Sequence, residues 1–542
     1  MQFNLADLLE SVVDHVPDRE ALYAEGRRLS FREFDDRANR LAHHFTANGI
    51  GHGDHVGCHM MNGTEYLETM YALFKIRAVP INVNFRYVQE ELRYLYDDAD
   101  LVAVVFDTEF AAKVGAVLPM VAGIRHLIAV GPTEGYDLPV GTVLFEDALA
   151  AQPAHREGFP ERSGDDLFII YTGGTTGMPK GVMWRQENLF FAGMGGGYPA
   201  GEPLAAPQEA GPRALANSPL VSFPAPPLMH GAAELGSFIN LLGGGKVVLI
   251  RRYTGDGALS LIEQEKINTI TIVGDAMAVP LIEALALRSA DTTRDGYDTS
   301  SLLALASAGA LLSQPLRDQL NEYLPNVYLN DSFGSTETGY NGSAPPGSKA
   351  SEGLRFTVNA RTTVLDDDFK PVVPGSGVVG RVAQRGHIPL GYYGDEAKTA
   401  KTFVVVDGER WVLPGDMATI EQDGTMRFLG RGSICINSGG EKIYPEEVEA
   451  ALKSHPALVD AVVAGIPDER WGQRVAAVLQ VHEGAQAPSQ EDIAEHLSVL
   501  IARYKVPRFV HVVDTIARSP SGKPDYTWAT TVLVEAAAGV LT

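Results

Sequence analysis

Short runs of apolar, mostly β-branched residues recur along the first half of the chain. Each run has the length and composition of a buried strand; the runs are VAVVF (102–106), HLIAV (126–130), LFIIYT (167–172), KVVLI (246–250) and TITIV (269–273). Amphipathic segments lie between several of them, such as EELRYLYDDA (90–99) and ALSLIEQEKI (258–267). This alternation predicts α/β layers built on largely parallel sheets.

The composition and the pattern of apolar residues change at three places further along the chain. Residues 192–227 are rich in Gly, Pro and Ala, which predicts a long surface loop. After about residue 350 short strands and turns take over, and the acidic run 366–368 is expected to be a solvated turn that holds no metal. A domain boundary is expected near residue 430. The residues beyond it, about 110 of them, have the pattern of a compact α+β unit.

Composition narrows the classes of function. The 542 residues include 44 Lys and Arg against 68 Asp and Glu, and the net charge of −24 disfavours a nucleic acid or an anionic membrane as the main partner. The only two cysteines, Cys58 and Cys435, are far apart, so a reducing compartment fits better than a disulfide framework. The N-terminal stretch alternates apolar and acidic residues unlike a signal peptide, and no apolar run approaches the ~18 residues that span a bilayer. We therefore expect a cytoplasmic protein without integral membrane association.

Residues 171–181, YTGGTTGMPKG, combine four glycines, three threonines and one lysine directly after an apolar run. Glycines let backbone N–H groups approach a phosphate, and hydroxyl and ammonium groups complete such a site. An ordinary flexible loop would explain neither the threonines nor the lysine. The spacing is not that of a Walker A loop, because Pro179 precedes Lys180 and Gly181 follows it. The stretch predicts a phosphate-binding loop where a strand turns into a helix.

Seven segments in order resemble the motifs of the adenylate-forming (ANL) superfamily, which includes acyl-CoA synthetases, luciferases and peptide-synthetase adenylation domains. They span nearly the whole chain and are YTGGTTGMPKG (171–181), PPLMHG (226–231), SAGALLS (307–313), DSFGSTET (331–338), WVLPGD (411–416), GRGSICINSGGEKIYPEEVE (430–449) and SPSGKPD (519–525). Together with NVNFRY (82–87), the first and sixth are most similar to bacterial acyl-CoA synthetases of the fatty-acid and steroid side-chain type.

The resemblance implies a fold, a reaction and co-substrates. The fold would have a large N-terminal domain of layered α/β sheets with a small β-barrel-like subdomain (1–430), a hinge (431–433, with Ser433) and a smaller mobile α+β domain (434–542). A carboxylic acid would react with ATP and Mg²⁺ to give acyl-AMP and pyrophosphate, and coenzyme A would then take the acyl group. A homodimer is compatible with the family, and the sequence leaves the oligomeric state open.

The same resemblance assigns catalytic and nucleotide-binding roles residue by residue. Lys523 would bridge the attacking carboxylate and the α-phosphate, Glu337 would hold Mg²⁺, and Thr336 would donate to the α-phosphate. Thr172, Thr175, Thr176 and Lys180 would bind the outer phosphates, and Asp416 with Arg431 would bind the ribose. The complete set for ATP and AMP is Thr172, Gly173, Gly174, Thr175, Thr176, Gly177, Lys180, Ala308, Gly309, Ala310, Asp331, Ser332, Phe333, Gly334, Asp416 and Arg431.

Further residues are assigned to the acyl group and to coenzyme A. His230 would gate the passage between the acyl pocket and the thiol channel, with a structural histidine as the alternative. The acyl pocket would comprise His230, Gly231, Gly274, Asp275 and Met277, and the thiol arm would pass Ser438, Gly439 and Gly440. Asp275 could instead cap a strand end. The small and apolar residues suggest a bulky apolar acid, medium- to long-chain, steroid or terpenoid.

Several positions depart from the family pattern. Gly173 stands where a serine is usual, Ser433 replaces an Asp or Lys at the hinge, and Asn437 replaces a lysine. Ala308 and Leu311 depart from the usual Gly and Pro at the adenine turn. A member that only thioesterifies a preformed acyl-adenylate is therefore a second hypothesis, and a non-catalytic ligand-binding scaffold is a third.

Overall fold

The structure is a computed structural model of the chain. It describes residues 2–174, 177–197, 201–290, 296–310, 312–345, 354–438, 441–468, 471–498, 500–518 and 523–539. The predicted strands and amphipathic segments are confirmed as strands and helices. The helices are α1 Leu5–His15, α2 Phe31–Ala47, α3 Thr64–Lys75, α4 Gln89–Asp98, α5 Ala111–Val117, α6 Phe145–Ala150, α7 Gln186–Gly193, α8 Ala210–Ala216, α9 Gly231–Leu242, α10 Gly255–Glu265, α11 Gly274–Ala290, α12 Gln314–Tyr323, α13 Glu396–Thr402, α14 Pro445–Leu452, α15 Gln490–Ser498 and α16 Tyr526–Ala537.

The first sheet has a parallel centre and an antiparallel edge. In spatial order its strands are β19 Gly391–Tyr392, β9 Gly177–Arg185, β8 Leu167–Gly174, β4 Val79–Asn82, β3 His55–His59, β5 Leu101–Asp107, β6 His126–Val130 and β7 Thr142–Leu144. From β8 to β7 neighbouring strands are parallel, whereas β9 pairs antiparallel with both β8 and β19.

The second sheet combines parallel and antiparallel strands. Its order is β2 Arg27–Ser30, β1 Glu20–Ala24, β11 Lys246–Leu249, β10 Val221–Pro224, β12 Thr269–Ile272, β13 Ala304–Ala308, β14 Tyr328–Ser335, β15 Gly339–Ser343, β16 Leu354–Val358, β23 Met426–Arg431, β22 Asp416–Ile420, β18 Gly380–Arg385, β21 Glu409–Val412 and β20 Phe403–Val406, with β17 Thr362–Leu365 beside β18. The sheet is parallel from β1 to β14, has the antiparallel strand β2 at one edge, and continues beyond β14 into an antiparallel, β-rich region.

Helices α1, α2, α3 and α9 share one core with strands of both sheets, where side chains such as Phe34, Phe74 and Phe238 are fully buried. The start of α2 shows how local sequence sets this layer: Ser30 accepts from the backbone of Glu33 while the Glu33 carboxylate accepts from the backbone of Ser30. None of the described helices is both long and apolar enough to cross a bilayer.

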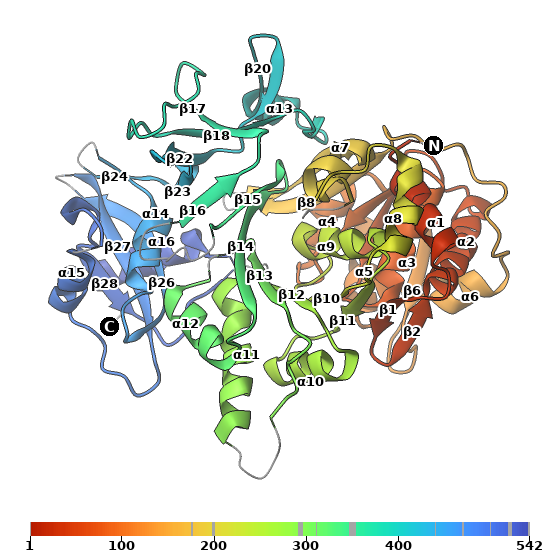
Figure 1. Cartoon of the computed structure of the whole chain (residues 1–542), viewed down its shortest axis with the longest axis horizontal. Coiled ribbons are helices and arrows are strands. Elements are labelled where there is room, and N and C mark those ends of the chain that lie inside the picture. The colour runs from red at the N-terminus through yellow and green to blue at the C-terminus, as the bar shows by residue number, and fades with distance from the viewer. Residues whose placement is uncertain are drawn as a thin grey trace.

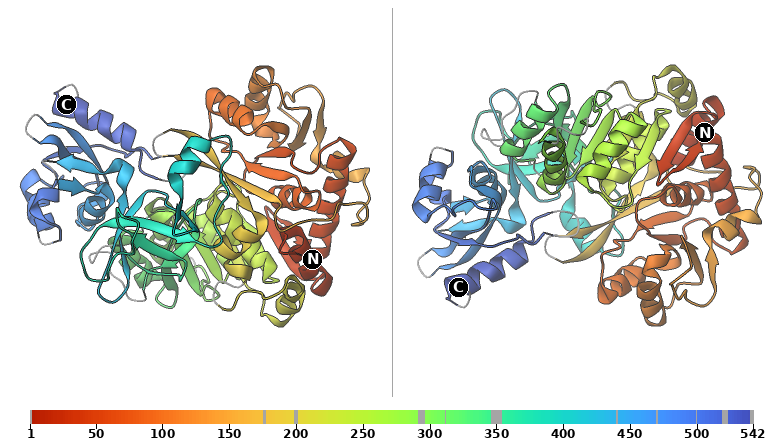
Figure 2. Two further views of the ribbon diagram at one scale, coloured as in Figure 1. Left: turned by 90° about the horizontal axis from the view of Figure 1, so that it is seen from above. Right: turned by 90° about the horizontal axis from the view of Figure 1, so that it is seen from below.

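A third sheet forms the C-terminal part of the chain. Its strands are β25 Glu441–Ile443, β24 Ile436–Ser438, β27 Gly472–Val481, β26 Leu458–Asp468 and, beside β27, β28 Phe509–Val512. Figure 1 shows this unit (blue) at the opposite end of the molecule from α1 and α2 (red), and both views of Figure 2 show it bordering the green and cyan segments. We call the part up to Arg431 the large domain and the part from Ile436 onward the small domain. That residues 431–433 act as a hinge stays a prediction.

Two expectations about local structure are wrong. The stretch 192–227 is not one long loop, because it contains the end of α7, α8 and β10. The apolar run that forms β10 is only four residues long and lies between prolines, so its strand signal is weak. The glycine-rich loop does not lead into a helix but closes a hairpin, in which Thr172 pairs with Lys180. Val182 and Trp184, both fully buried on β9, continue a strand pattern beyond the loop.

Candidate active site

A cavity of about 550 Å³ lies between the large and the small domain. The carboxyl ends of three neighbouring parallel strands, β12, β13 and β14, contribute to its lining. One wall comes from α9 of the large domain, and Lys523 to Tyr526 at the start of α16 close it from the small domain. Open α/β sheets bind their ligands at this edge, so the cavity is the candidate active site.

The phosphate loop lies at one side of this cavity. Thr172, Met178 and Pro179 line it, whereas Lys180 Nζ lies 3.8 Å from both Asp98 and Asp395. Tyr94, together with Asp98 and Asp395, raises the pKa of Lys180, which keeps the ammonium charged. Thr175 and Thr176 lie outside the described residues, and Gly173, Gly174 and Gly177 are described only as backbone of β8 and β9.

Asn82, at the end of β4, ties this loop to the segment that carries His230. Its side chain accepts from the Tyr171 backbone N–H (2.7 Å) and donates to the carbonyls of Tyr171 (2.8 Å) and Met229 (2.7 Å). The sequence analysis missed Asn82. A buried polar residue at the end of an apolar strand is the signal that would have found it.

Hydrogen bonds from two neighbouring strands, β9 and β19, hold Thr336 and Glu337 in place. Trp184 Nε1, on β9, donates to the Thr336 carbonyl (3.0 Å), and Tyr392, on β19, donates its hydroxyl to Glu337 Oε1 (2.8 Å). The two supporting strands are neighbours, with Val182 opposite Tyr392. Trp184 and Tyr392 are also residues that the sequence analysis missed, because their role arises only when β9 and β19 pair.

Lys523 lines the cavity from the small domain, and Glu337, Asp416 and Arg431, which act on its charge, are not part of the cavity lining. Asp416 and Arg431 lie opposite each other on β22 and β23, and Arg431 Nε donates to Asp416 Oδ1 (3.3 Å). Burial raises the pKa of Asp416, and Arg431 opposes that rise. Lys523 is buried, which lowers its pKa, and Arg431 adds to this effect, while Glu337 and Asp416 oppose it. Two acidic groups and one basic group thus surround the place where Lys523 enters.

His230 lines the cavity at the N-cap of α9, within the electrostatic influence of Lys523. Burial lowers its pKa to about 4, with Lys523 and Arg86 adding to the effect, so the imidazole is neutral at neutral pH. Within the described part of the chain its buried Nε2 has no hydrogen-bond partner. That atom is consistent with a cavity that receives a polar group there.

The other predicted nucleotide residues divide into two groups. Ala308, Gly309, Ser332, Phe333 and Gly334 line the cavity. Asp331 does not, because it forms an ion pair with Arg317 from α12. Ala310 uses its carbonyl to accept from Ser307 Oγ (3.1 Å), which shapes the turn after β13.

The apolar part of the cavity is lined by α9 rather than by the start of α11. Of the predicted acyl-pocket residues His230 and Gly231 line it, and the same helix face continues through Ala232, Leu235, Gly236 and Ile239. The cavity is not lined by Gly274, Asp275 or Met277. The chain turns directly after Val273, at Gly274, where φ is +49°. Asp275 contacts the small domain instead, and its carboxylate accepts from the Ser313 N–H (2.7 Å).

The predicted thiol-channel residues are not part of the cavity lining in this arrangement. Ser438 ends β24 and pairs with Glu441 and Gly472 within the small domain. Gly439 and Gly440, and the side chain of Ser433, lie outside the described residues.

The candidate site offers one oriented carboxylate, that of Glu337, as a ligand for Mg²⁺. Among the described residues no group of three or more His, Cys, Asp or Glu side chains forms a metal site. A magnesium ion that is held chiefly by nucleotide phosphates needs only one or two protein carboxylates, and Glu337, buried and held by Tyr392, suits that role.

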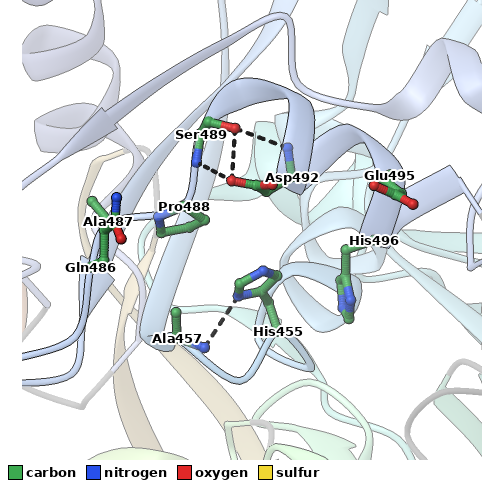
Figure 3. A pocket seen from close by; sticks show the side chains of 9 residues that line it. All are labelled: His455, Ala457, Gln486, Ala487, Pro488, Ser489, Asp492, Glu495 and His496. Atoms are coloured by element: carbon green, nitrogen blue, oxygen red, sulfur yellow. Dashed lines mark hydrogen bonds between the residues drawn. The ribbon is translucent and has the colours of Figure 1, made fainter.

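A second hollow of about 520 Å³ lies in the small domain, between α15 and the end of α14 (Figure 3). Its polar side chains form hydrogen bonds within the small domain. Asp492 accepts from the backbone and the hydroxyl of Ser489, His455 accepts from the Ala457 N–H, and His496 shares a hydrogen bond with the Ser454 hydroxyl. These contacts shape a helix start and a turn, so the hollow does not compete with the interdomain cavity as the active site.

Comparison with known proteins agrees with this geometry. Residues 9–393 match the family described as AMP-binding enzyme, and residues 447–523 match the AMP-binding enzyme C-terminal domain. A 3-oxocholest-4-en-26-oate–CoA ligase from Rhodococcus rhodochrous is 46% identical over 534 residues, covering 98% of this chain and 96% of that protein. A medium/long-chain-fatty-acid–CoA/3-oxocholest-4-en-26-oate–CoA ligase from Mycolicibacterium smegmatis is 45% identical over 540 residues, covering 99% and 97%.

Solved structures agree on the fold. The anthranilate CoA ligase AuaEII, in complex with anthranoyl-AMP, superposes with a TM-score of 0.82 at 22% identity, covering 99% of this chain and 98% of that one. The predicted α/β architecture with a large and a smaller domain is confirmed. The chain belongs to the AMP-binding enzyme family, within the adenylate-forming superfamily.

Proposed function

We propose that the protein is an ATP-dependent acyl-CoA ligase that activates a bulky apolar carboxylic acid, a medium- or long-chain fatty acid or a steroid side-chain acid, through an acyl-AMP intermediate. One observation carries the proposal: an apolar helix face and Lys523, which interacts electrostatically with Glu337, Asp416 and Arg431, line one cavity. The substrates named for relatives at 45–46% identity support the choice of acid.

The apolar face of α9 suits the hydrocarbon part of such an acid. Ala232 is exposed and Gly231, Leu235, Gly236 and Ile239 are partly exposed, although none carries a polar side chain. The opposite face of the helix, which includes Phe238 and Leu241, is fully buried. An apolar surface that faces a cavity rather than the core gains free energy when an apolar ligand covers it.

The charged end suits the first reaction. With the hydrocarbon along α9, the carboxylate would lie towards Lys523, whose ammonium offsets repulsion between the carboxylate and the α-phosphate as the two anions approach. Thr336 would donate to the α-phosphate, and Asp416 would accept from the ribose hydroxyls. Mg²⁺, bound at Glu337, would neutralise charge on the phosphates and on the departing pyrophosphate.

In the second reaction the thiol sulfur of coenzyme A would attack the acyl carbon, and AMP would leave with the bonding electron pair. His230 is neutral and lies where the thiol would have to pass, so it can border that path without adding a charge. The end of the cavity is filled by Lys523 to Tyr526 in this arrangement, so the small domain would have to move before the thiol could enter.

Two properties extend the proposal. Cys58 and Cys435 do not form a disulfide with each other, which supports a cytoplasmic location. A homodimer is part of the proposal by family resemblance alone, and sedimentation of the purified chain would test it.

Turnover with a panel of acids tests the function. The purified chain is incubated with ATP, Mg²⁺, coenzyme A and hexanoate, dodecanoate or a steroid side-chain acid, and both pyrophosphate and acyl-CoA are measured. Formation of both products is expected, and Lys523→Ala should abolish them while Lys401→Ala, at an exposed position, should not. Product from synthetic acyl-adenylate alone would identify a thioesterifying enzyme, and no product from any acid or adenylate would favour a scaffold.

A further inference from the structure

Asp275 links the large domain to the small domain through a buried ion pair. Its Oδ2 lies 3.5 Å from Nζ of Lys453, which follows α14 of the small domain. Asp275 is only 8% exposed and Lys453 only 6%. The other oxygen of Asp275 accepts from the Ser313 N–H, which fixes the carboxylate to the start of α12.

A chain of charges continues from Lys453 to the loop that carries Lys523. Lys453 Nζ lies 2.9 Å from Asp460 Oδ1. Asp460 in turn accepts three hydrogen bonds from the Arg518 guanidinium, from Nε to Oδ2 (2.8 Å) and from Nη2 to both Oδ1 (2.6 Å) and Oδ2 (2.5 Å). The backbone of Arg518 pairs with Pro524, the residue that follows Lys523. Arg518 and Pro524 therefore form the base from which Lys523 enters the cavity.

The same network reaches the other side of Lys523. Glu449, on α14, accepts from the Val463 N–H (2.9 Å) and from the hydroxyl of Tyr526 (3.3 Å), which lines the cavity. Lys453, Asp460, Arg518 and Glu449 all belong to the small domain. This network contacts the large domain through Lys453, which pairs with the carboxylate of Asp275.

We propose that Asp275 is a positioning residue, which docks the small domain through Lys453 so that Lys523 lies in the cavity during adenylate formation. The inference rests on the function proposed above. Asp275 touches no substrate, and it acts through Lys453, Asp460 and Arg518 on the place of Lys523. Because the small domain has to leave this position before the thiol enters, the Asp275–Lys453 contact has to break between the two reactions.

Asp275→Asn is the sharpest test, because the amide keeps the size of the side chain and an oxygen that accepts from Ser313, and removes only the charge. Adenylation, measured as acid-dependent pyrophosphate release, is expected to fall ~10-fold or more, since a small displacement of a catalytic group far from the mutation has effects of this size. Transfer from synthetic acyl-adenylate to coenzyme A should be unchanged or faster. Lys453→Met should act likewise, and the double variant should be no worse than Lys453→Met alone.

Asp298→Asn is the matched control, since it removes an exposed ion pair with Lys266 in the same domain and should change neither reaction. Equal losses in both half-reactions of Asp275→Asn, or no loss in adenylation, would overturn the proposal. Hydrogen exchange of the peptide 523–526 provides a readout that needs no turnover: it should be faster in Asp275→Asn than in the wild type. Absence of that difference refutes the inference even if no acid is activated, whereas faster exchange in an inactive protein would refute only the proposed function.

Discussion

Gly236 sets the length of acid that the proposed pocket accepts. A Cβ built on this residue would meet no heavy atom of the described chain within 4 Å, and its φ is not in the left-handed region. Leucine is therefore compatible with α9 at this position, and its side chain would extend into the cavity. Gly236 lies five residues beyond Gly231, or about 7.5 Å along the helix at ~1.5 Å per residue.

The expected effect of Gly236→Leu depends on the acid. A hydrocarbon chain spans about 1.25 Å per methylene, from a C–C bond of ~1.5 Å and an angle of ~111°. Hexanoate would therefore end near the level of Gly236 and dodecanoate would pass well beyond it. If the leucine takes the space of about three methylenes, dodecanoate loses ~2.4 kcal/mol of burial, or roughly 60-fold in kcat/KM, at ~0.8 kcal/mol per methylene.

The assay is acyl-CoA formation at a series of concentrations of each acid. Hexanoate should keep its kcat/KM within about twofold, because the loss concerns burial of the distal chain only. Gly51→Leu is the control, since Gly51 likewise has no neighbour within 4 Å of a Cβ, has an ordinary φ and lies outside the cavity. Equal losses for both acids, or the same change in Gly51→Leu, would refute the role of α9 as the acyl wall.

Three other outcomes are expected. Lys523→Ala should lower adenylation ~10²- to 10³-fold, the size of a lost electrostatic contact to the transition state, while transfer from supplied acyl-adenylate changes little; comparable loss in both half-reactions would contradict its role. Tyr392→Phe should lower the rate of adenylation about tenfold and raise the Mg²⁺ concentration needed for half-maximal activity, because Glu337 loses the hydroxyl that orients it. Tyr393→Phe, which loses only a hydrogen bond to Asp100, should change neither quantity. Burial raises the pKa of Glu234 to about 8 from its ordinary 4.5, so the folded state holds this proton more tightly than the unfolded chain and stability falls as pH rises through that window. Glu234→Gln should flatten the pH dependence of the thermal midpoint between about pH 5 and about pH 8, and an unchanged slope would show that Glu234 does not cause it.

Local patterns identified the apolar strands and amphipathic helices outside residues 192–227, and the ordered motifs identified part of the cavity lining. The apolar runs at 102–106 and 126–130 predicted β5 and β6 because their burial is continuous, and continuous burial leaves a continuous apolar run. The motif residues Thr172, His230, Thr336 and Lys523 come together at one cavity from distant parts of the chain. Their convergence followed from family resemblance, because no local pattern encodes it.

What escaped prediction depends on tertiary pairing. Asp275 was predicted in the acyl pocket, with a strand-end cap as the alternative, but it follows the turn at Gly274 and pairs with Lys453 of the other domain. Trp184 and Tyr392 have their roles only because β19 returns to pair with β9 after some 200 residues. Nothing near residue 392 in the sequence indicates its partner.

The pairing of β9 with β19 joins the predicted phosphate loop and Glu337, the carboxylate proposed for magnesium, in one rigid unit. One strand carries the loop and, through Trp184, holds Thr336, and its neighbour holds Glu337 through Tyr392. Side chains alternate between the two faces of a sheet, so inserting or deleting a single residue within 182–184 would turn Trp184 away from Thr336 and shift the register against Tyr392. Homologues should therefore exclude length changes along the stem of the hairpin.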